Sequence, residues 1–348
     1  MSLGFRREKD LRHLAMEGAF KEGGMVKPYW SRRVITVLIG LAIALGGCGK
    51  ASEPEGGAEL RGTVTVSGAW ALYPMMVRWG EEFHKLYPEV TFDISAGGAG
   101  KGMADALGGL VDIGMVSREI YPEEIEQGAF WVPVTKDAVM ATVNENNPVL
   151  ENLLDRGVPR EILEGIWITG DITAWGEVVD RSDVAYEIHI YTRSDACGAA
   201  QTWAQYLGGY AQEDLIGVAV YGDPGLAEAV SQDPLGIGYN NLNFAYAAAT
   251  GKPVAGIEIL PLDLNTNGRL DETENFYDTK GELMEAIAKG VYPSPPARAL
   301  NLVASGQPTG LTRAFMVWIL TEGQGYVEEV GYIPLPKEQL EEGLRKLE

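Results

Sequence analysis

The first third of the chain repeats one pattern, in which a β-branched apolar segment is followed by a turn of small residues. Segments 63–67, 90–94 and 111–118 are rich in Val, Ile and Thr, which predicts strands. The turns at 67–74 and 95–102 follow the first two segments and lead into stretches with the apolar spacing of helices. Strands that alternate with helices indicate a doubly wound α/β sheet, which contacts its ligand at the carboxyl ends of the strands.

The glycine-rich turn at 95–102 matches neither of the common nucleotide-binding motifs. Lys101 is not followed by Ser or Thr, as a Walker A loop requires. The spacing of Gly98, Gly100 and Gly102 also differs from that of a dinucleotide fingerprint. The sequence therefore gives no reason to expect a nucleotide in this turn.

A further strand–turn–helix corner lies in the middle of the chain, over residues 191–203. Residues 184–191 alternate apolar and polar side chains, which predicts a strand, and residues 199–207 have helical spacing. The small residues at 194–198 suit a turn and a helix N-terminus, where free N–H groups and the helix dipole favour an anion. Arg193 adds a fixed positive fork that suits a tetrahedral oxyanion. An ordinary corner with a surface arginine is the alternative interpretation.

The predicted strands fall into two groups, which indicates two lobes. Segments 130–134 and 138–143 are expected as two strands that leave the first lobe, with the polar segment 144–148 as a joint. The proline-rich segment 292–298 is rigid and extended, which suits a crossing back to the first lobe. We therefore predict lobe I from residues 62–142 and 298–348, and lobe II from residues 143–297.

The charge balance limits which partners the protein can have. The chain of 348 residues carries a net charge of −21, which argues against nucleic acid and anionic membrane surfaces as partners. A small anionic ligand is still compatible with this charge, because backbone N–H groups act locally and distant charges are screened within about 8–10 Å. With two cysteines and three histidines, the sequence has no disulfide framework and no metal-like spacing of these residues.

The N-terminal region has the features of a signal peptide followed by a lipid attachment site. Residues 1–24 are polar and of mixed charge, and we do not expect them to belong to the natural protein. From Met25, basic residues precede the apolar run 34–45, which is too short to span a bilayer comfortably. The following Leu45-Gly-Gly-Cys48 resembles a bacterial lipobox, which implies cleavage before Cys48 and a diacylglycerol on its thiol.

These features predict a membrane-anchored lipoprotein on the extracytoplasmic side of a bacterial cell envelope. Residues 1–47 are then an upstream extension and signal peptide, and residues 48–61 a flexible tether rich in Gly, Ala, Ser and Glu. A plain signal peptide followed by a chance cysteine is the alternative.

Residues 263–274 match the pattern of a calcium-binding loop. Oxygen-bearing groups fall at loop positions 1, 3, 5, 9 and 12, with glycine at position 6 and an apolar residue at position 8. The flanking segments are not paired EF-hand helices, so we expect a solitary loop with a structural calcium ion; an acidic, solvated turn is the alternative. The expected ligands are Asp263, Asn265, Asn267, the carbonyl of Arg269, Asp271 (through water) and Glu274.

Seven segments occur in the order typical of the PstS-type phosphate-binding proteins of bacterial ABC transporters, and the chain resembles this family over about residues 62–335. The corner Tyr191-Thr-Arg-Ser-Asp-Ala-Cys-Gly198 is similar to the family's His-Arg-Ser-Asp-Gly-Ser-Gly-Thr. The resemblance implies a two-lobed, type II-like periplasmic-binding-protein fold, in which each lobe is a sheet flanked by helices and a hinge closes the cleft on the ligand. The other segments are 67–74, 95–101, 111–114, 234–239, 292–298 and 322–335.

The resemblance also implies which residues contact the ligand. Turns of the first lobe are expected to donate backbone N–H groups, and Arg193 to donate its guanidinium while Asp195 orients it. Leu72 and Tyr73 as core residues, and Arg118 as a solvated loop charge, are the alternatives. The expected contacts are Ala71, Leu72, Tyr73, Ala99, Gly100, Ser117, Arg118, Arg193, Asp195, Cys197, Gly198 and Ala199.

Several positions depart from the family pattern. Ser117-Arg118 stands where many members have Ser-Asp, whose carboxylate accepts the proton of hydrogen phosphate. Asp195 is the remaining carboxylate of the constellation, so the expected site has a relaxed or altered preference for phosphate. Hydroxyl residues of the family are replaced at Leu72, Ala99, Cys197 and Ala199.

Three functional hypotheses follow. The resemblance implies a monomeric lipoprotein that captures phosphate or a similar oxyanion and passes it to an ABC transporter permease, with no nucleic acid involved. A sensor or scaffold of the same fold, without a transport role, is the alternative. The third hypothesis is an enzyme with Cys197 as nucleophile. The helix N-terminus and Arg193 would lower the pKa of its thiol. The reaction would also need a base, and His189 lies nearby in sequence.

Overall fold

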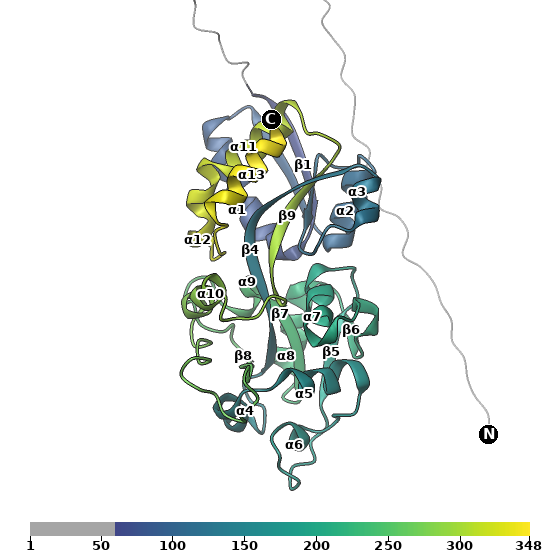
Figure 1. Ribbon diagram of the computed structural model, residues 1–348, viewed down its shortest axis with the longest axis vertical. Helices are drawn as coiled ribbons and strands as arrows, with labels where there is room; N and C mark the ends of the chain where they lie inside the picture. The colour runs from purple at the N-terminus through teal and green to yellow at the C-terminus, as the bar shows by residue number, and fades with distance from the viewer. Residues whose placement is uncertain (1–59) are drawn as a thin grey trace, which may run out of the picture. The chain divides into compact units, whose positions relative to one another are not determined.

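Residues 60–348 are described by the computed structural model, and they form an α/β protein in which helices flank one continuous curved sheet (Figure 1). The expected signal segment, Cys48 and nearly all of the tether lie outside the described residues. No helix within 60–348 combines the length and the apolar composition that a membrane crossing needs.

Lobe I contains the three strands predicted at the start of the chain. They are parallel, with β1 between β2 and β3, so their carboxyl ends and the turns that follow lie at one edge. The apolar face of the first helix is buried, as its spacing predicts, and Phe83 packs against Phe315 with ring centroids 5.0 Å apart. The elements are β1 (Gly62–Gly68), α1 (Tyr73–Leu86), β2 (Val90–Ala96), α2 (Ala99–Leu107), β3 (Ile113–Val116), α3 (Pro122–Glu126), α11 (Gly310–Leu320), α12 (Val327–Val330) and α13 (Lys337–Leu347).

Lobe II is built around a second group of strands and an aromatic core. Trp203 on one helix clusters with Trp167 and Tyr239, with its ring centroid 5.4 and 6.0 Å from theirs. The strands are β5 (His189–Arg193), β6 (Val218–Val220), β7 (Gly236–Asn241) and β8 (Ile257–Ile259). The helices are α4 (Leu150–Arg156), α5 (Arg160–Glu164), α6 (Trp175–Val178), α7 (Gly198–Gly208), α8 (Gly222–Gln232), α9 (Leu242–Ala245) and α10 (Lys280–Lys289).

Two long strands, β4 (Ala129–Asn144) and β9 (Ala297–Ser305), join the lobes (Figure 1). They pair antiparallel with each other, and the sheet order is β2-β1-β3-β9-β4-β7-β5-β6, with β8 also on β4. The prediction of separate strands at 130–134 and 138–143 is wrong, because β4 runs unbroken for 16 residues. The polar residues between them stay in the strand because the N–H and C=O of Lys136 both pair with Ile333.

The two hydrophobic cores show where one lobe ends and the other begins. Val134 and Leu300 belong to the core of lobe I, whereas Ala138 and Ala297 belong to the core of lobe II. The chain therefore crosses within residues 135–137 and 298–299, and the first crossing lies earlier than the predicted boundary at 142–143.

The central corner forms largely as predicted. Helix α7 spans Gly198–Gly208, which confirms the helix expected from residue 199. Strand β5 begins at His189 rather than at residue 184. The preceding residues are held by other contacts, since the N–H of Trp175 donates to Tyr186 O and that of Ile188 to Thr173 O.

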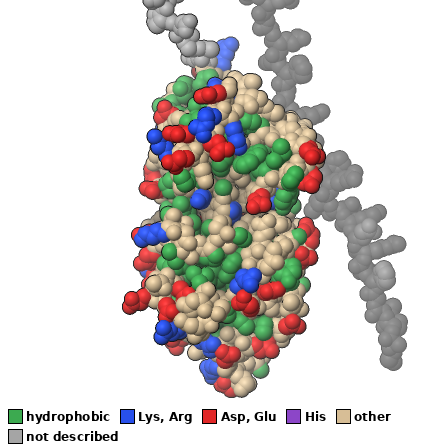
Figure 2. Space-filling view, in the orientation of Figure 1, with side chains coloured by type: hydrophobic (Ala, Val, Ile, Leu, Met, Phe, Trp, Pro, Cys, Tyr) green, Lys and Arg blue, Asp and Glu red, His purple; other side chains and the backbone are tan. Residues whose placement is uncertain are grey.

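Acidic side chains are spread over the visible face of the described residues, and basic side chains lie between them (Figure 2). No broad basic patch covers this face, which agrees with the net charge of −21 for the whole chain.

Candidate functional site

The candidate site lies where the lobes meet, at the carboxyl end of β5 and the N-terminus of α7. Arg193 is the last residue of β5, and its guanidinium is fully buried. The guanidinium donates from Nε and Nη2 to both oxygens of Asp195 (2.8 and 2.6 Å), and from Nη1 to Asp223 (2.6 Å). Burial alone would lower the pKa of Arg193, but the neighbouring carboxylates outweigh it and raise the pKa. The Arg193–Asp195 pair is as predicted, and Asp223 is an additional partner that the sequence analysis missed.

The N-terminus of α7 is a backbone anion site of the predicted kind. Cys197 is its N-cap residue, and its Sγ accepts from the N–H of Ala200 at 3.4 Å. Among the described residues, the first two helical N–H groups, from Gly198 and Ala199, have no acceptor. Such groups, with the helix dipole behind them, stabilise negative charge.

Ser117, the first residue after β3, contacts the N-terminus of α7 from lobe I. Gly198 approaches it so closely that a Cβ on this glycine would lie 2.2 Å from Ser117 O and 2.3 Å from Ser117 Oγ. The glycine turn of lobe I also contacts lobe II, since the N–H of Gly100 donates to Ala196 O at 2.9 Å. The structure therefore shows the lobes in direct contact at the expected site.

Several expected donors of lobe I are engaged in this arrangement. The N–H groups of Leu72 and Tyr73 donate to Ala69 O and Trp70 O within the turn. Leu72 is fully buried in the core of lobe I, as its alternative interpretation expects, and so is Ala99. Ala71 is also buried, and its carbonyl accepts from the Tyr332 hydroxyl.

Arg118 points to its own lobe rather than to Arg193. Its guanidinium pairs with both oxygens of Glu124 (2.9 and 2.6 Å) and stacks on the ring of Tyr121, 4.2 Å from the centroid. The interpretation as a solvated loop charge does not describe it either, because only 11% of the side chain is exposed.

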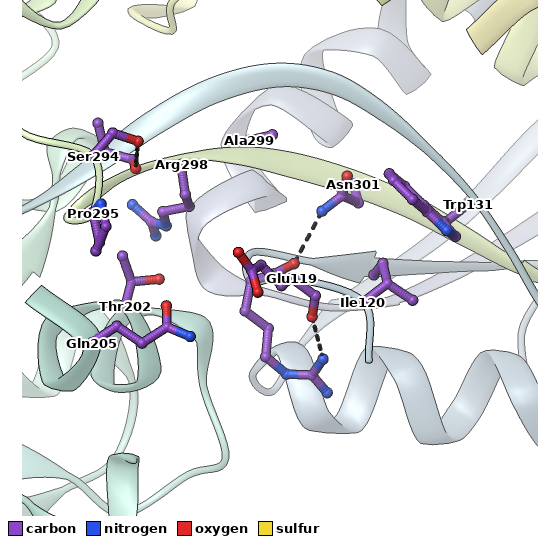
Figure 3. Close-up of a pocket in the computed structure, with 12 residues that line it drawn as sticks. Glu119, Ile120, Trp131, Thr202, Gln205, Ser294, Pro295, Arg298, Ala299 and Asn301 are labelled. Atoms are coloured by element: carbon purple, nitrogen blue, oxygen red, sulfur yellow. Dashed lines mark hydrogen bonds between the residues drawn. The ribbon is translucent and has the colours of Figure 1, made fainter. Parts of the chain in front are cut away.

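A cavity of about 450 Å³ opens between the lobes beside this site. Figure 3 shows Thr202 and Gln205 of α7 on one side, Glu119 and Trp131 toward the other, and Arg298 of β9 on the wall. Of the expected ligand contacts, Arg118 alone lines this cavity. The remainder of its lining is Ile120, Ser294, Pro295, Ala297, Ala299 and Asn301.

Arg298 joins this cavity to the buried site. Its Nε donates to Ser117 O (3.2 Å), its Nη2 to Asn241 Oδ1, and its Nη1 lies 3.5 Å from Asp137 Oδ2. The N–H of Asn241 in turn donates to Asp223, which holds Arg193. The sequence analysis placed Arg298 only in a crossing segment and did not consider Asp137. A charged residue within an apolar strand was the signal that could have drawn attention to Asp137.

The geometry argues against Cys197 as an activated nucleophile. Burial raises the pKa of Cys197 to about 12, in spite of the neighbouring Arg193, so the thiol is not activated at neutral pH. His189 lies at the opposite end of β5 from Cys197, and its Nδ1 pairs with Asp233 at 2.7 Å. The expected base therefore has another partner.

The acidic loop at 263–274 is ordered by its own hydrogen bonds. Both oxygens of Asp263 accept backbone N–H groups of the loop, and Oε1 of Glu274 accepts two more. The amides of Asn265 and Asn267 donate to Asp271, which lowers the pKa of that carboxyl. Within residues 60–348, no three His, Cys, Asp or Glu side chains are placed together to hold a metal ion.

Two α/β lobes that share a pair of crossing strands, with a buried arginine and a helix N-terminus between them, define the class of two-lobed binding proteins. A model of the family described as the PBP superfamily domain matches residues 53–322, and the chain belongs to this family.

Curated relatives and solved structures confirm the resemblance to PstS-type proteins. The phosphate-binding protein PstS of Pseudomonas aeruginosa is 24% identical, with 85% of this chain and 90% of the relative covered. PstS of Methanocaldococcus jannaschii is also 24% identical, with coverage of 90% and 95%. An ABC-type phosphate transport receptor from Vibrio cholerae has a similar fold, with a TM-score of 0.56, 19% identity and coverage of 78% and 100%. A structure from Clostridium perfringens, described as a candidate phosphate ABC transporter substrate-binding protein with bound phosphate, is also similar. Its TM-score is 0.63 and its identity 22%, with 79% of this chain and 100% of that chain covered.

Proposed function

We propose that this protein captures phosphate, or a similar tetrahedral oxyanion, between its lobes and delivers it to the permease of an ABC transporter. The observation that carries the proposal is the buried guanidinium of Arg193 beside the N-terminus of α7, opposite Ser117 of lobe I. The names of the curated relatives support phosphate as the first ligand to test.

The donors available at this site suit an oxyanion. A guanidinium carries five N–H donors, and the two carboxylates that hold Arg193 accept three of them. Two donors therefore remain for a ligand, in addition to the N–H groups of Gly198 and Ala199. The carboxylates of Asp195 and Asp223 fix the orientation of the Arg193 guanidinium before the ligand arrives, which reduces the entropy lost on binding.

Opening of the lobes is part of the proposal. Ser117 lies against Gly198 at the N-terminus of α7, so an oxyanion would reach the N–H groups there only when these residues separate. Opening would also release the N–H of Gly100 from Ala196 O. Closure on the ligand would then replace contacts between lobes by contacts through the anion.

Calorimetry on protein stripped of ligand tests the proposal, with phosphate, sulfate, arsenate and molybdate as titrants. Arg193→Ala should lower the affinity for the preferred anion by at least about tenfold, since a charged hydrogen bond contributes about 1.5–3 kcal/mol. Arg181→Ala is the control, because Arg181 makes the same type of pair with Asp183 in an exposed position. Undiminished affinity in Arg193→Ala would remove the site assignment.

We also propose that the protein is a lipoprotein of the bacterial cell envelope, anchored through Cys48. The lipobox-like Leu45-Gly-Gly-Cys48 after an apolar run supports this. A membrane anchor would keep the lobes beside a permease.

A structural calcium ion in the loop at 263–274 is a further proposal. The side-chain and carbonyl oxygens at the expected positions are the hard ligands that calcium prefers, and Asp263 and Glu274 are both buried within the loop. The side-chain oxygens of Asn265 and Asn267 already accept N–H groups of the loop, from Asn267 and Arg269.

A further inference from the structure

The cavity between the lobes stays open although the lobes already touch beside it. Ser117 lies against Gly198 and Gly100 donates to Ala196 O, yet a space of about 450 Å³ remains. This volume falls in the range of about 300–1,000 Å³ that is typical of small-molecule sites. A tetrahedral anion alone would fill only a small part of it. The space therefore offers room for a larger group next to the proposed anion site.

The cavity and the proposed anion site share helix α7. Gly198 begins this helix, and Thr202 and Gln205, which line the cavity, follow it by four and seven residues. Residues at this spacing lie on one face of a helix. With a rise of about 1.5 Å per residue, the cavity wall begins about 6 Å along the helix from its N-terminus. Arg298 forms a second link, because it lines the cavity and donates to Ser117 O.

Polar groups on the cavity wall are left without hydrogen-bond partners. Thr202 is only 2% exposed, yet its hydroxyl makes no hydrogen bond within residues 60–348, and neither does the side-chain amide of Gln205. Both groups point from α7 toward Glu119 of lobe I (Figure 3). Asn301 uses its amide N–H to donate to Arg118 O at 3.1 Å, which leaves its side-chain oxygen available. A buried polar group without a partner is unfavourable, so these groups indicate a ligand that can pair with them.

The charges on the wall favour a neutral ligand group that carries hydroxyls. The carboxylate of Glu119 would repel a second anionic group, and Arg118 and Arg298 would repel a cation. A hydroxyl both donates and accepts hydrogen bonds, so it matches the unpaired donors and acceptors of the wall. Ile120 and Trp131 supply apolar surface for the carbon atoms between hydroxyls.

We propose that the preferred ligand of this site is a phosphate monoester of a small polyol rather than free phosphate. This inference rests on the proposed function. The phosphoryl group would bind at Arg193 and the N-terminus of α7, and the polyol would occupy the cavity. The ester oxygen attaches the polyol, and the other phosphoryl oxygens remain for the donors of the anion site. Hydroxyls that pair with Thr202 and Gln205 break no hydrogen bond within the described protein, so their contribution to binding is not offset there.

Calorimetry with glycerol 3-phosphate and inorganic phosphate tests the inference in wild type, Thr202→Val, Gln205→Ala and Gln232→Ala. Wild type should bind glycerol 3-phosphate more tightly than phosphate, by about tenfold, because the added atoms make contacts of their own. Thr202→Val keeps the shape of the side chain and removes the unpaired hydroxyl, which preserves the fold. This variant and Gln205→Ala should each bind glycerol 3-phosphate at least about threefold more weakly, with phosphate affinity unchanged.

Gln232→Ala is the matched control, since it makes the same change at an exposed glutamine at the end of α8, outside the cavity lining. Both affinities should equal those of wild type. Inorganic phosphate should displace glycerol 3-phosphate, and Arg193→Ala should weaken both ligands, because both are expected to use the same anion site.

The outcomes separate this inference from the proposed function. If wild type binds neither ligand, the proposed function fails. If wild type binds glycerol 3-phosphate no more tightly than phosphate, or if neither cavity variant weakens it selectively, the inference is overturned although the protein still binds an oxyanion. Glycerol 3-phosphate that binds alongside saturating phosphate, or that keeps its affinity in Arg193→Ala, lies elsewhere on the protein and would overturn the inference as well.

Discussion

At the scale of single residues, the pKa values of two aspartates are shifted in opposite directions. Asp137 is buried without a hydrogen-bond partner, and its pKa is raised from 3.8 to about 6. Burial would likewise raise the pKa of Asp233, but hydrogen bonds from Leu235 N–H, Tyr191 and His189 lower it overall. A carboxyl whose pKa is raised on folding destabilises the native state when it is ionised, and one whose pKa is lowered stabilises it.

Asp137→Asn should therefore stabilise the ligand-free protein at pH 7.5. The shift corresponds to a penalty of about 3 kcal/mol, which is present above pH 6 and disappears as the pH falls towards 3.8. We expect the variant to raise Tm by at least about 3 °C at pH 7.5, and the gain to shrink towards pH 4.5. Asp233→Asn should lower Tm at pH 7.5 instead. Thermal melts of the three proteins across pH check this; a Tm of Asp137→Asn below that of wild type at pH 7.5 would contradict it.

Gly198→Ala should prevent the lobes from closing. The added Cβ would meet the backbone oxygen of Ser117 at 2.2 Å, a contact that cannot be relieved by a side-chain rotation. We expect at least a tenfold loss of anion affinity, and no compaction on addition of anion in small-angle scattering. Gly281→Ala is the matched control, since it lies in the first turn of α10 and its Cβ would meet nothing within 4 Å. Ligand-induced compaction in Gly198→Ala equal to that of wild type would show that the lobes do not need this approach.

At the scale of helices and strands, features set by neighbouring residues could be predicted from the sequence, whereas contacts between distant residues could not. Helix α7 and the pair of Arg193 with Asp195 follow from a short stretch of sequence, because cap residues and helical spacing act over a few positions. Asp223 reaches the same guanidinium from α8, 30 residues along the chain, which no local pattern indicates.

Strand β4 shows why Asp137 was missed. A polar interruption such as Thr135-Lys136-Asp137 usually marks the end of a buried strand, since buried charges are unfavourable. In this protein the polar residues lie where the strand passes from one hydrophobic core to the other. The interruption therefore marked the site between the lobes rather than a turn.

The loop at 263–274, for which we propose a calcium ion, gives a prediction at this scale. A solitary extracellular loop with few carboxylates should bind calcium weakly, with Kd of roughly 10⁻⁴–10⁻³ M. Calcium titration followed by calorimetry should give one site in wild type and none in Glu274→Gln, and chelator should lower the Tm of wild type. Glu272→Gln, at a loop position with no expected ligand role, is the control. The assignment is wrong if chelator leaves Tm unchanged and Glu274→Gln binds calcium as wild type does.

At the scale of the whole molecule, the proposed lipidation of Cys48 would decide where the protein works. Mass spectrometry of protein from its native membrane should find a mature chain that begins at Cys48 and carries a lipid adduct. Cys48→Ser should release the protein from the membrane fraction, because a protein without acyl chains has no stable anchor. Cys197→Ser should leave the anchoring unchanged, since Cys197 is buried in lobe II. A mature chain that starts elsewhere would falsify this claim.

The route of the chain through its sheet also sets an order of assembly. Lobe I takes β1 to β3 from the beginning of the described chain, but β9, which lies between β3 and β4, and helices α11 to α13 come from its end. Because the chain is synthesised from its N-terminus, all of lobe II has been made while one edge of β3 still lacks its partner strand β9. A chain cut short before residue 297 would keep the corner with Arg193 but could not complete the opposite wall. If the protein binds an anion as proposed, a copy that lacks β9 and helices α11 to α13 should not hold it, although Arg193 and α7 are present.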